Sequence, residues 1–315
     1  MKKKPILAII IPCYNEEETL FFTSEKLLEI LQKLIIQQQI SSQSFLFFID
    51  DGSKDKTWEI ISSQSQKNPL VKGLKLSANA GHQNALLAGM FSTYAEVDCI
   101  ISIDADLQDD IDIIPEMINE FQKGNEIVYG VRSDRKSDSL FKRKTAEWFY
   151  SFVQKLGLEI KPNHADFRLM STKAVKALNE FEESNIFLRG ICPKLGFQTS
   201  DVFYLRQKRV YGETKYPLAK MLSFAWNGIS SFSIAPLRLS GLMGGLSLMV
   251  TLVLSISTFW EYLAGRTVPG WASIMIAILF LGSVQLLSIA ILGEYIGKIF
   301  TEVKKRPRYI IEKKI

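Results

Sequence analysis

Clusters of acidic, amide, hydroxyl and basic side chains follow directly after five short apolar runs, at residues 12–16, 50–55, 77–82, 104–106 and 132. Asp104 and Asp106 are the sharpest pair, because two carboxylates that flank one small residue can hold a hard divalent cation such as Mg²⁺ or Mn²⁺. An ion held there would neutralise the charge on a leaving nucleoside diphosphate. A solvated acidic turn is the alternative for an isolated Asp-x-Asp sequence.

The apolar runs before these clusters have the length of buried β-strands, at residues 6–11, 45–49, 71–76, 100–103 and 127–131. Segments with helical spacing, such as 19–36 and 113–122, separate several of them. This alternation predicts an α/β domain with a largely parallel sheet over residues 1–216. Because ligands bind outside the carboxyl ends of the strands in such sheets, we expect the five clusters to form one composite site.

Composition excludes some classes of protein. The 315 residues exceed the usual size of one domain, so one large domain with an appendage is expected. The net charge of +5 is too weak to argue for nucleic acid as a partner. The three cysteines are far apart in the sequence, and we expect them to be reduced and buried rather than paired.

Two long stretches near the C-terminus carry no charge, residues 239–260 and 267–293. About 20 apolar residues span a bilayer, so we expect a transmembrane hairpin within 239–297. Its helices would cover about 239–260 and 270–293. A buried helical hairpin in a large core is the alternative.

The distribution of basic residues predicts the orientation of this hairpin. Residues 298–315 are rich in Lys and Arg, whereas the loop between the two spans has few charges. The positive-inside rule therefore places this basic tail, and with two spans also the N-terminal domain, on the cytoplasmic side of the inner membrane. Trp260, Tyr262 and Trp271 lie beside the loop, as an aromatic belt requires.

Residues 217–238 precede the first span, and apolar side chains recur in them with helical spacing. We expect an amphipathic helix that lies in the membrane interface. An ordinary amphipathic helix packed on the soluble domain is the alternative. Either way, this segment would connect the N-terminal domain to the hairpin.

Six segments carry an ordered set of motifs: Pro12-Cys13-Tyr14-Asn15-Glu16, Asp50-Asp51-Gly52-Ser53, Asn79-Ala80-Gly81-His82, Asp104-Ala105-Asp106-Leu107-Gln108-Asp109, Ala165-Asp166-Phe167-Arg168 and Arg209-Val210-Tyr211-Gly212-Glu213-Thr214-Lys215. As a set they resemble family 2 glycosyltransferases of the GT-A fold. The likeness is closest to the polyisoprenyl-phosphate sugar transferases, which include the dolichol-phosphate mannose synthases and the bacterial GtrB-like branch. It covers nearly the whole chain. Asp110 departs from the family, which commonly has Pro there.

The resemblance implies a role for each matching residue. The nucleotide and its sugar would be bound by Pro12, Tyr14, Glu16, Asp50, Asp51, Asn79, Asp104, Ala105 and Arg132. The metal, Mg²⁺ or Mn²⁺, would be held by Asp104, Asp106 and Gln108. Phosphates of the donor or acceptor would contact Arg209 and Lys215. The catalytic residues would be Asp106, Asp166 and Arg168. His82 could touch a phosphate or simply begin a helix.

The implied reaction is the inverting transfer of a sugar, with a UDP-hexose favoured as donor, to a polyisoprenyl phosphate. The product would be a lipid-linked sugar for modification of cell-envelope glycans. A lipid monophosphate has a second pKa of about 6, so near neutrality it can attack the anomeric carbon without a base. This favours Asp166 as a residue that positions a cation or the acceptor, with proton removal by Asp166 as the alternative.

Other interpretations stay open. A hydroxyl acceptor, as in glycolipid or polysaccharide synthesis, would need a true general base. A processive synthase is disfavoured, because no Trp follows an Arg as in the Gln-x-x-Arg-Trp motif of such enzymes. A catalytically inactive membrane adaptor would have no need of the acidic and basic motif residues. The family analogy suggests a homo-oligomer, specifically a tetramer.

Overall fold

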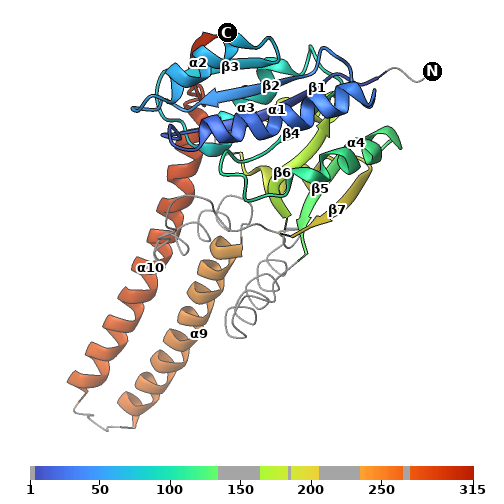
Figure 1. The fold of residues 1–315 in the computed structure, drawn as a ribbon. Coiled ribbons are helices and arrows are strands. Elements are labelled where there is room, and N and C mark those ends of the chain that lie inside the picture. Colours follow the sequence, from blue (N-terminus) through green and yellow to red (C-terminus); the bar gives the residue numbers. More distant parts are fainter. Residues whose placement is uncertain (1–3, 134–163, 184–185, 206–234, 265–269) are drawn as a thin grey trace. The chain divides into compact units, whose positions relative to one another are not determined.

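The computed structural model describes residues 4–133, 164–183, 186–205, 235–264 and 270–315, and the chain divides into two units (Figure 1). The first unit holds the described residues up to 205 together with 307–315, and the second holds 235–264 and 270–306. The elements of the first unit, in chain order, are β1 (Leu7–Cys13), α1 (Leu20–Ile36), β2 (Phe45–Asp50), α2 (Thr57–Lys67), β3 (Val71–Leu76), α3 (His82–Thr93), β4 (Cys99–Ser102), η1 (Ile111–Ile113), α4 (Ile114–Gln122), β5 (Ile127–Arg132), β6 (His164–Ser171), α6 (Thr172–Asn179), α7 (Leu188–Lys194), β7 (Thr199–Tyr204) and β8 (Ile311–Lys314). The second unit contains α9 (Ala235–Leu263) and α10 (Trp271–Val303).

One eight-stranded sheet organises the first unit, in the order β7-β5-β6-β4-β1-β2-β3-β8. β1 pairs in parallel with β2 and β4, and β2 pairs in parallel with β3. β6 runs antiparallel between β4 and β5, so β5 points in the same direction as β1 to β4. The carboxyl ends of β1 to β5 and the beginning of β6 therefore meet at one edge. The prediction of an α/β domain with a mostly parallel sheet is confirmed.

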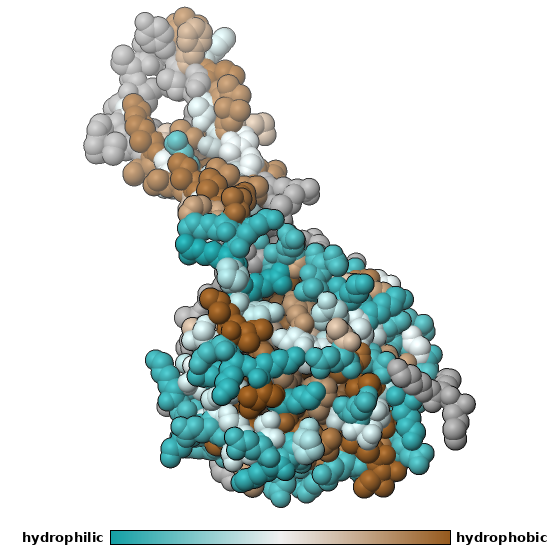
Figure 2. Space-filling view, turned by 90° about the horizontal axis from the view of Figure 1, so that it is seen from above, coloured by the Kyte–Doolittle hydropathy of each residue, from teal (hydrophilic) through white to brown (hydrophobic). Residues whose placement is uncertain are grey.

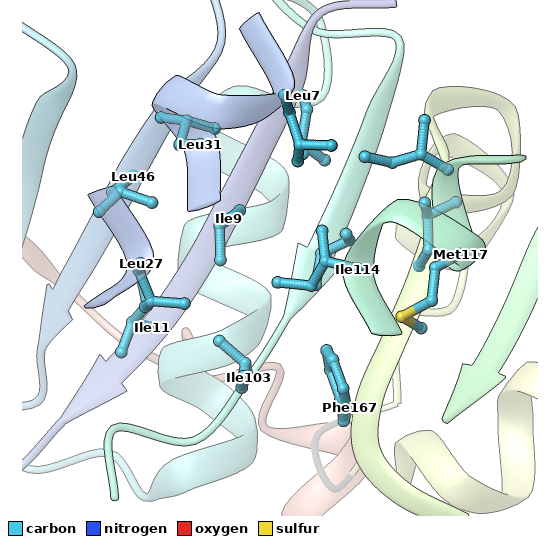
Figure 3. Packing of buried hydrophobic residues seen from close by; sticks show 14 of the residues in the cluster. Leu7, Ile9, Ile11, Leu27, Leu31, Leu46, Ile103, Ile114, Met117 and Phe167 are labelled. Atoms are coloured by element: carbon cyan, nitrogen blue, oxygen red, sulfur yellow. The ribbon is translucent and has the colours of Figure 1, made fainter. Parts of the chain in front are cut away.

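Helices cover both faces of this sheet. Ile9 of β1 belongs to a buried cluster with Leu27 of α1 and Ile114 of α4 on one face (Figure 3). On the other face α3 lies close to β1, since a Cβ at Gly89 would be 2.6 Å from Ile10 Cγ2. Strands buried on both faces need apolar side chains at every position, which is why they appear in the sequence as continuous apolar runs.

The C-terminal residues form the last strand of the same sheet. β8 pairs antiparallel with β3, and Ile315 extends the pairing through backbone bonds with Gly73 in both directions. Lys75 Nζ lies 3.0 Å from Glu312 Oε1 across the two strands. The basic composition of residues 298–315 predicted a tail and did not reveal this strand. All of its side chains are exposed, so it has no apolar alternation to mark it.

The second unit is a pair of helices that pack against each other. Within the described residues, one helical segment, Ala277–Val303, is long and apolar enough to cross a membrane, and α9 holds a shorter apolar segment, Ser240–Val253. On the face seen in Figure 2, the described residues of the helices are mostly hydrophobic, whereas those of the first unit are mostly hydrophilic. Exposed apolar surface of this extent is typical of contact with lipid or protein. Residues 217–234 of the predicted interfacial segment lie outside the described residues, and its last residues, 235–238, belong to α9.

Candidate active site

The loops after β1 and β2 are joined by hydrogen bonds. Asn15 has a φ of 54°, its N–H donates to Ser53 Oγ over 3.0 Å, and its Oδ1 accepts from the Lys54 N–H over 2.9 Å. The Glu16 N–H donates to Thr57 Oγ1 over 2.9 Å. These bonds hold the two predicted nucleotide-binding loops against each other at the carboxyl edge of the sheet.

The first loop presents its three predicted donor-binding residues differently. Pro12 is buried within β1, whereas the Tyr14 side chain is 43% exposed. Glu16 is half-buried, and its Oε2 accepts from Thr19 Oγ1 over 2.7 Å. Tyr14 therefore offers an accessible aromatic ring beside the acidic loop, and such rings stack readily on bases.

The second loop is built around two aspartates with different surroundings. Asp51 accepts from the Ala80 N–H over 2.7 Å and from the Gly81 N–H over 3.0 Å, which ties the loop after β2 to the loop after β3. Burial raises the pKa of Asp51, and these two bonds oppose the rise only in part. Asp50 is fully buried, and its Oδ2 has no hydrogen-bond partner among the described residues. Asp51 thus joins the two loops, whereas Asp50 is enclosed by the protein.

The loop after β4 carries the predicted metal ligands. Thr23 Oγ1 of α1 donates to the Ala105 carbonyl over 2.6 Å, and Ala105 is buried. Leu107 has a φ of 46°, and the Gln108 N–H donates to Asp106 Oδ1 over 3.2 Å. This tight turn fixes the backbone between the two carboxylates and the Gln108 side chain, which is also buried.

Asp104 lies among other acidic groups at the edge of the sheet. Burial raises its pKa to about 6, and the nearby acidic groups raise it further while His82 opposes them. Asp104 Oδ1 is buried without a hydrogen bond in the described part of the chain, and His82 Nε2 lies 3.4 Å away. No group of three or more His, Cys, Asp or Glu that could hold a metal occurs among the described residues. Asp104, Asp106 and Gln108 would nevertheless suit Mg²⁺, because this ion usually takes one or two carboxylates and completes its shell with water and substrate phosphate oxygens.

Asp166, near the start of β6, is held by three basic side chains. Arg189 of α7 approaches with Nε 3.2 Å from Oδ1 and Nη2 3.1 Å from Oδ2. Arg168 Nη2 lies 2.6 Å from Oδ1, and His82 Nε2 lies 3.6 Å from Oδ2. Burial alone would raise the pKa of Asp166, but these three groups hold it well below its usual value. Burial would likewise lower the pKa of His82, but Asp166 and Asp104 raise it.

Arg168, predicted as a catalytic residue, lies beneath this cluster. Its side chain is fully buried, and Nη1 donates to Cys192 Sγ over 3.0 Å. Cys192 is free and buried, as are Cys13 and Cys99, which confirms the expectation for the cysteines. Because the Arg168 guanidinium has no exposed surface, it can bind Asp166 but cannot contact the phosphate of a ligand.

Arg132, at the end of β5, is held within the protein. Its Nη2 lies 3.0 Å from Asp109 Oδ1, and its Nε donates to Tyr204 Oη over 3.2 Å. The Tyr204 hydroxyl donates to the same Asp109 oxygen. Burial and the Asp109 carboxylate together raise the pKa of the Tyr204 hydroxyl. The triad of Arg132, Asp109 and Tyr204 ties the loop after β4 to β5 and β7.

The structure adds residues that the sequence motifs did not include. Arg189 and Tyr204 are the clearest cases, because each contacts a motif aspartate from a distant element. Neither stands in a recognisable motif, so only the packing of α7 and β7 in the fold brings them to the site. Asn79, predicted to bind the nucleotide sugar, is exposed in the loop after β3. Arg209 and Lys215 lie outside the described residues.

The parallel sheet, the acidic loops at its carboxyl edge and the carboxylate held by cations define a glycosyltransferase of the GT-A type. Comparison with family models agrees with this class. Residues 8–178 match Glycosyl transferase family 2, and the chain belongs to this family. Residues 235–299 match the GtrB C-terminal hairpin, a range that begins with α9 and ends within α10.

Three relatives align over nearly their whole length. The chain is 50% identical to the uncharacterized glycosyltransferase YkoT of Bacillus subtilis, over 99% of this chain and 92% of YkoT. It is 40% identical to the prophage bactoprenol glucosyl transferase homolog of Escherichia coli, over 98% of each chain. It is also 40% identical to the bactoprenol glucosyl transferase of Shigella phage SfII, over 98% of this chain and 97% of that one.

Proposed function

We propose that this glycosyltransferase moves a sugar from a nucleotide-sugar donor to the phosphate of a polyprenyl-phosphate lipid. Two relatives that carry bactoprenol glucosyl transferase in their names align with the chain from end to end, helical hairpin included. A UDP-hexose is the favoured donor. The product would be a lipid-linked sugar for modification of cell-envelope glycans.

One observation carries this proposal, namely the surroundings of Asp166. A hydroxyl acceptor requires a base, and a useful base has a pKa near the working pH. The pKa of Asp166 is held well below its usual value by His82, Arg168 and Arg189, so this carboxylate accepts a proton poorly. A phosphate acceptor brings its own negative charge and needs no base. The cluster therefore suits a phosphate better than a hydroxyl group.

The roles of the loops follow from this reaction. Tyr14 and Asp50 would contact the nucleoside of the donor. Asp104, Asp106 and Gln108 would hold Mg²⁺ or Mn²⁺, which when bound stabilises the negative charge of the leaving diphosphate. The acceptor phosphate oxygen would form the new bond to the anomeric carbon as the bond to the diphosphate breaks, and the configuration would invert.

The membrane arrangement is part of the same proposal. α9 and α10 would form the transmembrane hairpin, with the catalytic unit and residues 307–315 on the cytoplasmic side. An amphipathic segment before α9 would lie in the interface, and the chain would assemble as a homo-oligomer, by family analogy a tetramer. Arg209 and Lys215 would contact phosphates of the donor or acceptor.

A transfer assay tests the proposal with a matched acceptor. The purified full-length protein is incubated with Mn²⁺, a panel of radiolabelled UDP- and GDP-sugars, and either undecaprenyl phosphate or undecaprenol. We expect lipid-extractable label with one UDP-hexose and undecaprenyl phosphate, none with undecaprenol, and none with the Asp106→Ala variant. Transfer to undecaprenol or to a glycolipid hydroxyl, with none to the phosphate, would overturn the proposed acceptor. Absence of transfer to any acceptor would favour an inactive adaptor.

A further inference from the structure

Arg189 differs from the other described arginines of the site in what it leaves accessible. Arg168 is fully buried against Asp166 and Cys192, and Arg132 is bound by Asp109 and Tyr204. The side chains of Arg189 and Arg132 are 36% and 29% exposed, but the described contacts of Arg189 are to one carboxylate, whereas Arg132 is bound by a carboxylate and a hydroxyl. Of the three, it is the guanidinium that a ligand at the edge of the sheet can best reach.

The two arginines in direct contact with Asp166 carry more positive charge than this one carboxylate neutralises. Arg168 and Arg189 both bind the one Asp166 carboxylate, so two permanent cations share a single negative charge. Arg168 takes the deeper position, with a 2.6 Å contact. An anion that binds beside Arg189 would balance the excess charge, because a partly buried cation is stabilised by a close negative partner.

The unused donors of Arg189 suit a phosphate. Within the described part of the chain, Arg189 bonds to Asp166 through Nε and Nη2. A guanidinium has five N–H donors in a planar fork, so the Nη1 amino group keeps its two donors for a ligand. Arginine is well suited to phosphate for this reason, since its fork can bond two phosphate oxygens at once.

The position of Arg189 favours the acceptor phosphate over the donor diphosphate. Asp104 lies beside the His82 ring nitrogen, His82 faces Asp166, and Asp166 binds Arg189. Acidic and basic side chains therefore alternate from the predicted metal ligand towards α7. The start of α7, which carries Arg189, is joined to α3, because the Leu188 N–H donates to Gln83 Oε1 over 3.2 Å. The donor diphosphate belongs with Asp104, which leaves Arg189 for a second phosphate.

We propose that Arg189, held in place by Asp166, binds the phosphate of the lipid acceptor. This inference rests on the proposed function, because it assigns a contact within that reaction. Asp166 then acts as a positioning residue, and its carboxylate keeps the Arg189 guanidinium turned towards the incoming phosphate. The same contacts with His82, Arg168 and Arg189 hold the pKa of this carboxylate well below its usual value, so it stays ionised, as a group that orients a cation must.

Steady-state kinetics with the full-length protein test this assignment. Arg189→Gln removes the charge, Arg189→Lys keeps it without the fork, and Lys194→Ala is the matched control. Lys194 is an exposed cation five residues further along α7, and that spacing places it on another face of the helix. KM is measured separately for undecaprenyl phosphate and for the donor, and thermal unfolding verifies that each variant is folded.

We expect Arg189→Gln to raise the KM for undecaprenyl phosphate by about ten- to a hundredfold, the range for loss of a charge-assisted hydrogen bond. Arg189→Lys should recover part of this loss, and Lys194→Ala should change neither KM. A fall in kcat with an unchanged KM for the lipid would overturn the proposal and make Arg189 a support for Asp166 alone. A rise in the donor KM instead would assign the contact to the diphosphate. Wild-type transfer to undecaprenyl phosphate tests the proposed function independently of these outcomes.

Discussion

Gly52 lies where the loops after β2 and β3 approach each other. Its replacement by alanine should lower both the stability of the first unit and the affinity for the nucleotide-sugar donor. Its φ is +66°, a conformation in which a Cβ costs about 1–2 kcal/mol. A Cβ there would also lie 2.6 Å from both Ala78 C and Asn79 N. These are backbone atoms and cannot rotate away, so the loop after β3 must move.

Movement of that loop strains the bonds it makes with the preceding loop. Asp51 accepts from the Ala80 and Gly81 N–H groups, and a hydrogen bond to a charged group contributes about 1.5–3 kcal/mol. Loss of one such bond together with the backbone strain predicts that Gly52→Ala lowers the free energy of unfolding by about 3–5 kcal/mol. In a domain of this size that corresponds to a fall in melting temperature of roughly 6–20 °C.

The assay is thermal unfolding of the detergent-solubilised protein, followed by titration with a UDP-sugar. Gly124→Ala is the matched control, because Gly124 has a φ of +105° and nothing within 4 Å of the added Cβ. It should show backbone strain alone, about 1–2 kcal/mol or roughly 2–8 °C, with normal donor affinity. Equal melting temperatures and donor affinities for the two variants would refute the argument from the close approach of the two loops.

Three further predictions concern the carboxylates of the site. Asp166→Asn should retain measurable turnover whereas Asp106→Ala abolishes it, and equal complete loss in a radiolabel transfer assay would contradict a positioning role. Tyr204→Phe removes one of the two described side-chain donors of buried Asp109, so the melting temperature should fall by roughly 2–8 °C, for about 1–2 kcal/mol. The folded-state pKa of Asp104 is about 6, above the ordinary Asp value, so the metal-free protein loses stability as the pH rises from about 4 to 6. Mn²⁺ needs the ionised carboxylate, so its affinity by calorimetry should rise up to about pH 6 and then level off, and a flat profile would count against Asp104 as a ligand.

β1 to β5 were predicted from their apolar runs, which in β1 and β2 are continuous because both faces of these strands are buried. Ile9 and its neighbours in β1 show this most clearly, since all seven residues of the strand are buried. The position of Asp104 and Asp106 followed from the apolar run that forms β4, the strand that pairs with β1 in the centre of the sheet. β6 and β7 were not predicted from the sequence. β8 could not be found in this way, because an exposed edge strand needs no apolar pattern.

The contacts of Asp166 show what local sequence cannot reveal. Its relation to Arg168 is visible in the sequence, since the two residues are two apart on one strand and point to the same face. Arg189 is separated from Asp166 by 23 residues and His82 by a larger interval, so no spacing rule connects them. The resemblance to a known family marked Asp166 and said nothing of Arg189.

By itself, the sequence determined the α/β class, the acidic loops at the ends of the strands and an apolar C-terminal region. Each of these depends on local composition or on spacing along one element, which the sequence records directly. Only the tertiary structure decided which cations reach Asp166, that Arg168 is buried while Arg189 stays accessible, and that Arg132 is bound by Asp109. These depend on the packing of elements distant in the chain, and the same local sequence is compatible with many such arrangements.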